Sequence, residues 1–111
     1  MKFEELTGDD LGVYHDDNYQ LVQCYDGHIV LSYARKGRAM TAHIASDKIG
    51  LRNLKEAIDS FCQWIFDVYR WCRFIFAAIS KRLNSMERLV IKCGFKYLIS
   101  DESHHIYERA R

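Results

Sequence analysis

The sequence predicts an α+β domain in which a mixed, mostly antiparallel sheet packs against one long central helix and one short C-terminal helix. Three observations support this prediction. Residues 19–46 hold three strand-prone runs separated by turn signals, and residues 54–72 repeat their apolar side chains with helical spacing. Short apolar runs then follow the helical stretch, which indicates a β-α-β crossover within the sheet.

Length and composition favour one folded domain over residues 1–111. Hydrophobic residues make up 49% of the chain and charged residues 28%, a balance that is typical of globular proteins and unlike disordered ones. The 16 basic and 15 acidic side chains nearly cancel, which argues against nucleic acid as a partner. No apolar run is long enough to cross a membrane, and the N-terminus has no apolar signal core, so we expect no membrane association and a cytoplasmic location.

The four cysteines predict neither a metal site nor a redox motif. No two of them form a CxxC pair, and no histidine stands at zinc-finger spacing. Each lies among apolar residues, so we expect buried thiols that act as small hydrophobic side chains. We predict no metal site elsewhere in the chain.

The N-terminal part predicts a short first strand in residues 1–6 and a loop in residues 7–18. The loop is acidic, with carboxylates at Asp9, Asp10, Asp16 and Asp17. Their spacing lacks the regular ligand series and terminal glutamate of an EF-hand, so a solvated acidic loop is favoured over a calcium site.

A three-stranded meander is expected next. Residues 19–25 and 28–34 are strand-prone and flank Asp26-Gly27, a dipeptide that favours a type I′ hairpin turn. A second turn at 35–38 leads to a third strand at 39–46.

The stretch from 54 to 72 predicts the principal helix. Its wide apolar face suits packing across a sheet, and the opposite arc is charged. The residues that define the apolar stripe are Leu54, Ile58, Phe61, Ile65, Val68 and Cys72. The following run, 73–80, reads as a buried strand.

The C-terminal third predicts a short helix at 85–93 and strands at 96–100 and 104–109. The helix carries an apolar stripe and should stop at Gly94, which can adopt the left-handed conformation that closes a helix. Phe95 would then fold back onto that stripe. His104 and His105, adjacent on the last strand, should face opposite sides and lie at the surface.

This order of elements, with KCGF at residues 92–95, resembles the GNAT family of acetyl-CoA-dependent N-acetyltransferases over residues 19–109. The stretch RLVIKCGFKYLI looks like the final helix of that family and the strand after it. The resemblance implies a GNAT-like fold, acetyl-CoA as cofactor and an amine as acceptor. The family normally has helices between its first two strands, whereas this chain has only the acidic segment 7–18.

The resemblance implies a pyrophosphate site where the long helix starts, because backbone N–H groups and the helix dipole favour an anion there. Asp47 stands where the family has a basic or amide residue, and Arg52 where it has a tiny one. A plain strand-to-helix connection is the alternative. The implied cofactor contacts are Lys48, Gly50, Leu51 and Arg52 in the loop, Ile44 in a β-bulge region of strand 39–46 that would pair with the pantetheine arm, and Asn84 at the short helix.

The resemblance also implies catalytic roles. His43 is the titratable candidate for a base that deprotonates the acceptor amine, although a structural histidine is the alternative. The family's usual general acid, a tyrosine in the final helix, is replaced here by Val90, which has no hydroxyl. Asn84 has an alternative role as a helix cap.

Three functions follow as hypotheses. The first is an N-acetyltransferase. The second is a catalytically inactive GNAT-fold protein of phage type that acts through protein-protein binding or virion assembly, with a protein partner or homodimer held by exposed Trp64, Trp71 and Tyr107. The third and weakest is nucleic-acid binding by the basic residues Arg35, Lys36, Arg38, Arg109 and Arg111.

Overall fold

The computed structural model describes residues 1–9 and 11–111 and has the predicted α+β architecture. A single seven-stranded sheet has the order β1-β2-β3-β4-β5-β7-β6. The pair β4 and β5 is parallel and joined by the crossover helix, and every other neighbouring pair is antiparallel. No helix in the described part of the chain is long and apolar enough to span a bilayer.

The elements match the predicted order. The strands are β1 (Glu4–Leu6), β2 (Gln20–Cys24), β3 (Ile29–Lys36), β4 (Ala39–Ser46), β5 (Phe74–Ser80), β6 (Lys96–Ser100) and β7 (His104–Ala110). The helices are α1 (Leu54–Val68) and α2 (Asn84–Lys92), and the short 3-10 helix η1 (Gly50–Asn53) leads directly into α1.

The first hairpin forms as predicted, but its connection is longer than a two-residue turn. Cys24 pairs with Ile29, which leaves four residues between the strands. Tyr25, Asp26 and Gly27 all have positive φ, and the His28 N–H donates to the Tyr25 carbonyl oxygen. The left-handed turn therefore begins one residue earlier than the Asp26-Gly27 dipeptide indicated.

Helix α1 lies across the sheet and builds the main core. Phe61 and Ile65 are buried against strand residues such as Met40 and Ile75. The predicted helix extends too far, because α1 ends at Val68 and Cys72 lies in the turn before β5. Cys72 is nonetheless fully buried. It fits the apolar spacing of the predicted helix because it packs in the core, although it lies outside α1.

Helix α2 ends as predicted. Gly94 has a φ of 85°, its N–H donates to the Ile91 carbonyl oxygen, and the Phe95 N–H donates to that of Val90. These two bonds form a Schellman motif. Phe95 is buried in the core, which confirms that it folds back onto the helix.

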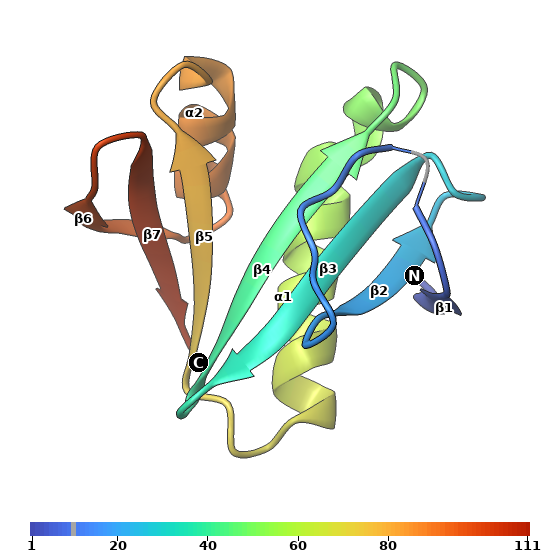
Figure 1. Cartoon of the computed structure of the whole chain (residues 1–111), viewed down its shortest axis with the longest axis horizontal. Helices are drawn as coiled ribbons and strands as arrows, with labels where there is room; N and C mark the ends of the chain where they lie inside the picture. The colour runs from blue at the N-terminus through green and yellow to red at the C-terminus, as the bar shows by residue number, and fades with distance from the viewer. Residues whose placement is uncertain (10) are drawn as a thin grey trace.

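The two faces of the sheet are covered differently. Both helices lie behind the sheet in Figure 1, and the chain between β1 and β2 crosses in front of it. This segment has no helix or strand in its described residues, as expected, but it is more than a solvated loop. Val13 is buried with Leu21 and Val30, and these residues form a small second core. Asp10, one of the four predicted acidic residues, lies outside the described residues.

The predicted burial of the cysteines is confirmed, and the predicted exposure of three aromatic residues is wrong. All four cysteines are buried free thiols, and burial raises the pKa of Cys24 to about 11 and that of Cys62 to about 12. Tyr107 is buried, and Trp64 and Trp71 are partly buried against the main core. These three side chains therefore do not form the exposed aromatic surface that was expected, and the partner itself stays a prediction.

Candidate functional site

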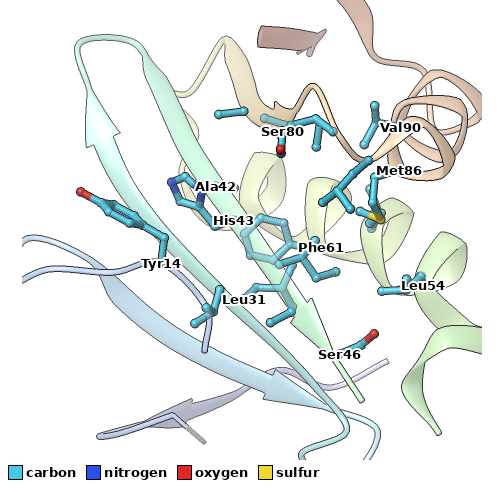
Figure 2. A pocket seen from close by; sticks show the side chains of 18 of the residues that line it. Tyr14, Leu31, Ala42, His43, Ser46, Leu54, Phe61, Ser80, Met86 and Val90 are labelled. Carbon is cyan, nitrogen blue, oxygen red and sulfur yellow. The ribbon is translucent and has the colours of Figure 1, made fainter. Parts of the chain in front are cut away.

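Strands β4 and β5 separate part of the way along the sheet and open a cleft. They pair from Ala39 with Phe74 to Ala42 with Ala77, and beyond that point β4 continues to Ser46 and β5 to Ser80 without pairing. A cavity of about 650 Å³ lies at this opening (Figure 2). Its size is within the usual range for small-molecule and cofactor sites.

The edge of β4 that faces the opening is the part best suited to hold an extended ligand. On its other side β4 keeps an unbroken register with β3 from Ala39 to Ser46, so the predicted β-bulge is absent from this pair. The separation from β5, and not a bulge, leaves this edge without a neighbouring strand. Backbone N–H and C=O groups there are free to bond an amide-containing chain.

Apolar side chains from strands and both helices line the interior of the cleft. Figure 2 shows Leu31, Phe61, Met86 and Val90 converging on the cavity from β3, α1 and α2. Ile44 of β4 also lines it. Polar groups are few and are contributed by Ser46, Ser80 and two histidines. A mostly apolar cavity with a few polar groups favours a thin, largely aliphatic ligand.

His43 lies where the cleft reaches the face of the sheet opposite the helices. Its ring centroid is 4.9 Å from that of Tyr14, and its Nε2 is 3.4 Å from the hydroxyl of Tyr19. It shares a face of β4 with Thr41, whose hydroxyl also contacts Tyr19. Burial lowers the pKa of His43, and electrostatic repulsion with His104 lowers it further. The imidazole is therefore neutral near pH 7 and can accept a proton.

His104 is a site residue that the sequence reasoning missed. It begins β7 opposite Ser80 and lines the cleft, whereas His105 faces α2, with Nε2 3.4 Å from a Glu87 carboxylate oxygen. The two histidines do point to opposite faces, as predicted. The sequence did not show that β7 lies beside β5 at the opening, and Tyr14 was missed because the segment that carries it has no regular structure.

Asp47 takes part in the turn that leads into η1. One carboxylate oxygen accepts from the Gly50 N–H at 2.9 Å, and the other lies 2.6 Å from His28 Nδ1. The His28 bond and then the Gly50 bond lower the pKa of this carboxyl, so it is ionised at neutral pH. The Asp47 carboxylate therefore already accepts from one of the backbone N–H groups that, by the resemblance, a pyrophosphate would use.

Gly50 has a packing reason to be glycine. It is buried, and a Cβ at this position would collide with the carbonyl oxygen of His28 and with the side chain of Ile29. The loop thus packs tightly onto the β2–β3 hairpin. Leu51 is exposed and lines the cleft.

The other predicted cofactor contacts are not brought into the cleft together. Lys48, in the turn before η1, and Arg52, in η1, both have exposed side chains. The backbone places Asn84 at the first residue of α2 and Leu83 at the capping position. The side chain of Asn84 lies outside the described part of the structure.

The position that the resemblance matches to the family's general acid is apolar. Val90 is buried and forms part of the cleft wall. Two tyrosines lie on the side of His43: Tyr14 lines the cavity, and the Tyr19 hydroxyl contacts His43. Tyr14 is largely exposed, and its hydroxyl points away from the cavity in Figure 2.

The acidic segment forms the rim on the face that carries His43. Asp9 accepts from the N–H groups of Leu11 and Val13, and the Ser32 hydroxyl donates to the Tyr14 carbonyl oxygen. A second, more polar cavity lies between this segment and β1, lined by Glu5, Asp16, Asp17 and Tyr19 among others. Among the described residues no cluster of His, Cys, Asp and Glu could hold a metal ion.

The order of elements and the divided sheet define a GNAT-like fold. The similar solved structures include an acetyltransferase from Bacillus subtilis in complex with CoA, which has a TM-score of 0.70 and 10% identity over 86% of this chain and 78% of that one. A chimera of the spermidine N-acetyltransferase SpeG from Vibrio cholerae and hSSAT has a TM-score of 0.69 and 11% identity, over 86% and 69% of the two chains.

A third similar structure is the ribosomal-protein-S5-alanine acetyltransferase from Vibrio fischeri. It has a TM-score of 0.64 and 17% identity over 83% of this chain and 60% of that one. No family model matches the sequence, and no curated protein matches it. At these identities the likeness establishes the GNAT-like fold that the sequence predicted, and the fold alone.

Proposed function

We propose that this chain binds an acyl-CoA thioester, with the pantetheine arm in the cleft between β4 and β5, and transfers the acyl group to an amine. The observation that carries the proposal is the separation of the two strands beyond Ala42 and Ala77. It supplies an apolar cavity beside an unpaired strand edge, which fits an amide-containing aliphatic arm. When bound, the thioester would supply the activated acyl group.

The cleft and the loop fit this cofactor unequally. We expect the cavity to hold the arm, whereas the Asp47 carboxylate already accepts from the Gly50 N–H and would repel a pyrophosphate. Lys48 and Arg52 carry compensating charge at the same turn. We therefore expect most of the binding free energy to come from the arm and less than usual from the phosphates.

His43 is the proposed proton acceptor. Its neutral imidazole would take a proton from the ammonium form of the acceptor, directly or through one water, so that the free amine can attack the thioester carbonyl. The leaving sulfur needs a proton, and Val90 cannot supply one. Tyr14 lines the cleft, but its hydroxyl points away from it (Figure 2), so water is the proposed proton donor.

The proposal is tested by filling the cleft. Ala78 lines the cavity, so Ala78→Leu should remove the rise in melting temperature that saturating acetyl-CoA gives to the unaltered protein. Ala110→Leu, at the exposed end of β7, is the matched control and should keep the rise. An equal rise in both variants would place binding elsewhere.

A non-catalytic acyl-CoA-binding protein is the second candidate. Val90 and the Asp47 contact favour it, because both depart from the arrangement that the family uses for transfer. A thiol-release assay with a panel of amines separates the two candidates. Turnover that is lost in His43→Gln supports the transferase, and cofactor binding without turnover supports the binding protein.

A further inference from the structure

Strand β6 ends the sheet with an exposed apolar edge. Tyr97, Leu98 and Ile99 are consecutive and expose 58%, 48% and 60% of their surface. Figure 1 shows β6 as the outermost strand on the side of β7 and α2. Consecutive large apolar residues on an edge strand are typical of a surface that is covered in the functional state.

The backbone of this edge also has groups that β7 does not use. The register between the two strands passes from Tyr97 opposite Tyr107 to Ile99 opposite Ile106, which leaves Leu98 without a partner. Such a bulge leaves the extra residue unpaired within its own sheet. The outer N–H and C=O groups of β6 face no other strand in the described residues.

The opposite edge of the sheet is protected against pairing. Strand β1 has three residues, and two of them are the exposed carboxylates Glu4 and Glu5. Two copies of β1 would oppose four like charges. Of the two outer strands, only β6 is therefore suited to pair with another strand.

The charges flanking β6 make it complementary to itself. Lys96 begins the strand, and Asp101 and Glu102 follow it, all with exposed side chains. If two copies of β6 pair about a two-fold axis beside Leu98 and Ile99, the two strands are antiparallel. The basic end of each β6 then lies beside the acidic end of the other. Opposite charges across an antiparallel pair are favourable, and a two-fold axis makes the contact twice.

We propose that two copies of this chain associate through β6, antiparallel, about a two-fold axis near Leu98 and Ile99. The interface covers the three exposed apolar side chains and continues the sheet from one copy to the other. None of Lys96–Ser100 lines the cleft between β4 and β5, so dimer formation and acyl-CoA binding can be lost separately.

The first test measures the mass in solution by sedimentation equilibrium across a range of protein concentrations. The unaltered protein should show a concentration-dependent dimer. Leu98→Lys should shift the dissociation constant by at least tenfold, whereas Ile49→Lys, at another exposed apolar residue in the loop before η1, should leave it unchanged. Circular dichroism confirms that both variants are folded.

The second test uses charge reversal to establish the two-fold arrangement. Lys96→Glu and Glu102→Lys each place like charges together in a homodimer and should weaken it several-fold. An equimolar mixture of the two variants restores both opposite-charge contacts and should form a heterodimer with the original affinity.

Three results would overturn the proposal. The first is a monomer at every protein concentration, and the second is a dimer whose dissociation constant Leu98→Lys does not change. The third is a mixture of Lys96→Glu and Glu102→Lys that dimerises no more tightly than either variant alone. Binding of an extended peptide from another protein to a strictly monomeric chain would assign the edge to a different occupant. None of these results bears on the acyl-CoA proposal, which is tested by ligand binding.

Discussion

The imidazole of His43 is held in a desolvated position by the rings of Tyr14 and Tyr19, and this environment determines its charge. Burial and His104 lower its pKa below the ordinary value of 6.5. In the unfolded chain that shift is absent, so the unfolded state binds the proton first as the pH falls. The neutral form is thus linked both to stability and to the proposed role as a base.

Acid should destabilise the protein partly through this residue. The contribution of neutral His43 is complete above about pH 6.5 and is lost as the pH falls from there through the lower folded pKa. His43→Gln should therefore flatten the fall in the urea midpoint between pH 7 and pH 5, relative to the unaltered protein. Parallel slopes for the two proteins would contradict the buried neutral imidazole.

At Gly50 the constraint is steric. Gly50→Ala should lower the free energy of unfolding by about 1–3 kcal/mol, because the methyl group would overlap His28 and Ile29 and force the loop off the hairpin. Gly8→Ala is the matched control, since a Cβ there meets no atom within 4 Å. Urea unfolding of both variants checks the difference, and equal losses would show that the loop is not tightly packed.

At the scale of elements, the end of α2 depends on the backbone of one residue. A Cβ on Gly94 would approach only the side chain of Arg109, at 3.9 Å, so a substitution here reports the cost of a positive φ and little else. The Schellman bonds of Gly94 and Phe95 fix where the chain turns into β6.

Gly94→Ala should cost about 1–2 kcal/mol of unfolding free energy, because a Cβ is strained in the left-handed conformation. Gly94→Asn should cost less, since asparagine is tolerated there. Thermal unfolding of the two variants provides the comparison. If alanine proved no worse than asparagine, the helix would end by some other means.

Local patterns predicted the elements well and their ends less well. The strand predicted at 39–46 matches β4, and the stop predicted at Gly94 matches the end of α2. Helix α1 ends at Val68, before the predicted Cys72. Cys72 is buried by tertiary packing outside the helix, and its spacing only coincides with the helical repeat. The hairpin turn begins at Tyr25 because a longer connection, with three positive φ values, replaces the two-residue turn.

The site was harder to predict, because its residues meet only through the topology. His43 and Ile44 were predicted from one strand and do line the cleft. His104 and Tyr14 come from distant segments, and no local pattern places them beside β4. That Asp47 bonds to both Gly50 and His28 depends on the hairpin packing against the loop, which sequence spacing does not encode.

At the scale of the molecule, the proposed binding site depends on the separation of β4 from β5 within the sheet. Strands β4 and β5 are held together at one end by four residue pairs and by the core beneath them, and they separate at the other end. Both helices lie on one face, so the cleft is open toward the thin segment between β1 and β2 on the other (Figure 1). An acceptor that reaches His43 must pass this acidic rim.

The charge at the entry to α1 should limit cofactor affinity. Asp47→Asn removes a negative charge from the turn while keeping an oxygen that can accept from Gly50. We expect it to tighten acetyl-CoA binding several-fold and to leave the binding of pantetheine, which lacks the pyrophosphate, unchanged. Equal effects on both ligands would place the phosphates away from this loop.

Isothermal titration of the protein with acetyl-CoA, with CoA as the comparison ligand, is the most direct test of the central claim. We expect one acetyl-CoA site per chain with micromolar affinity, and we expect this binding to be lost in Ala78→Leu and kept in Ala110→Leu. No heat at millimolar ligand, together with no thermal shift, would contradict it and would leave a GNAT-like fold whose cleft serves another purpose.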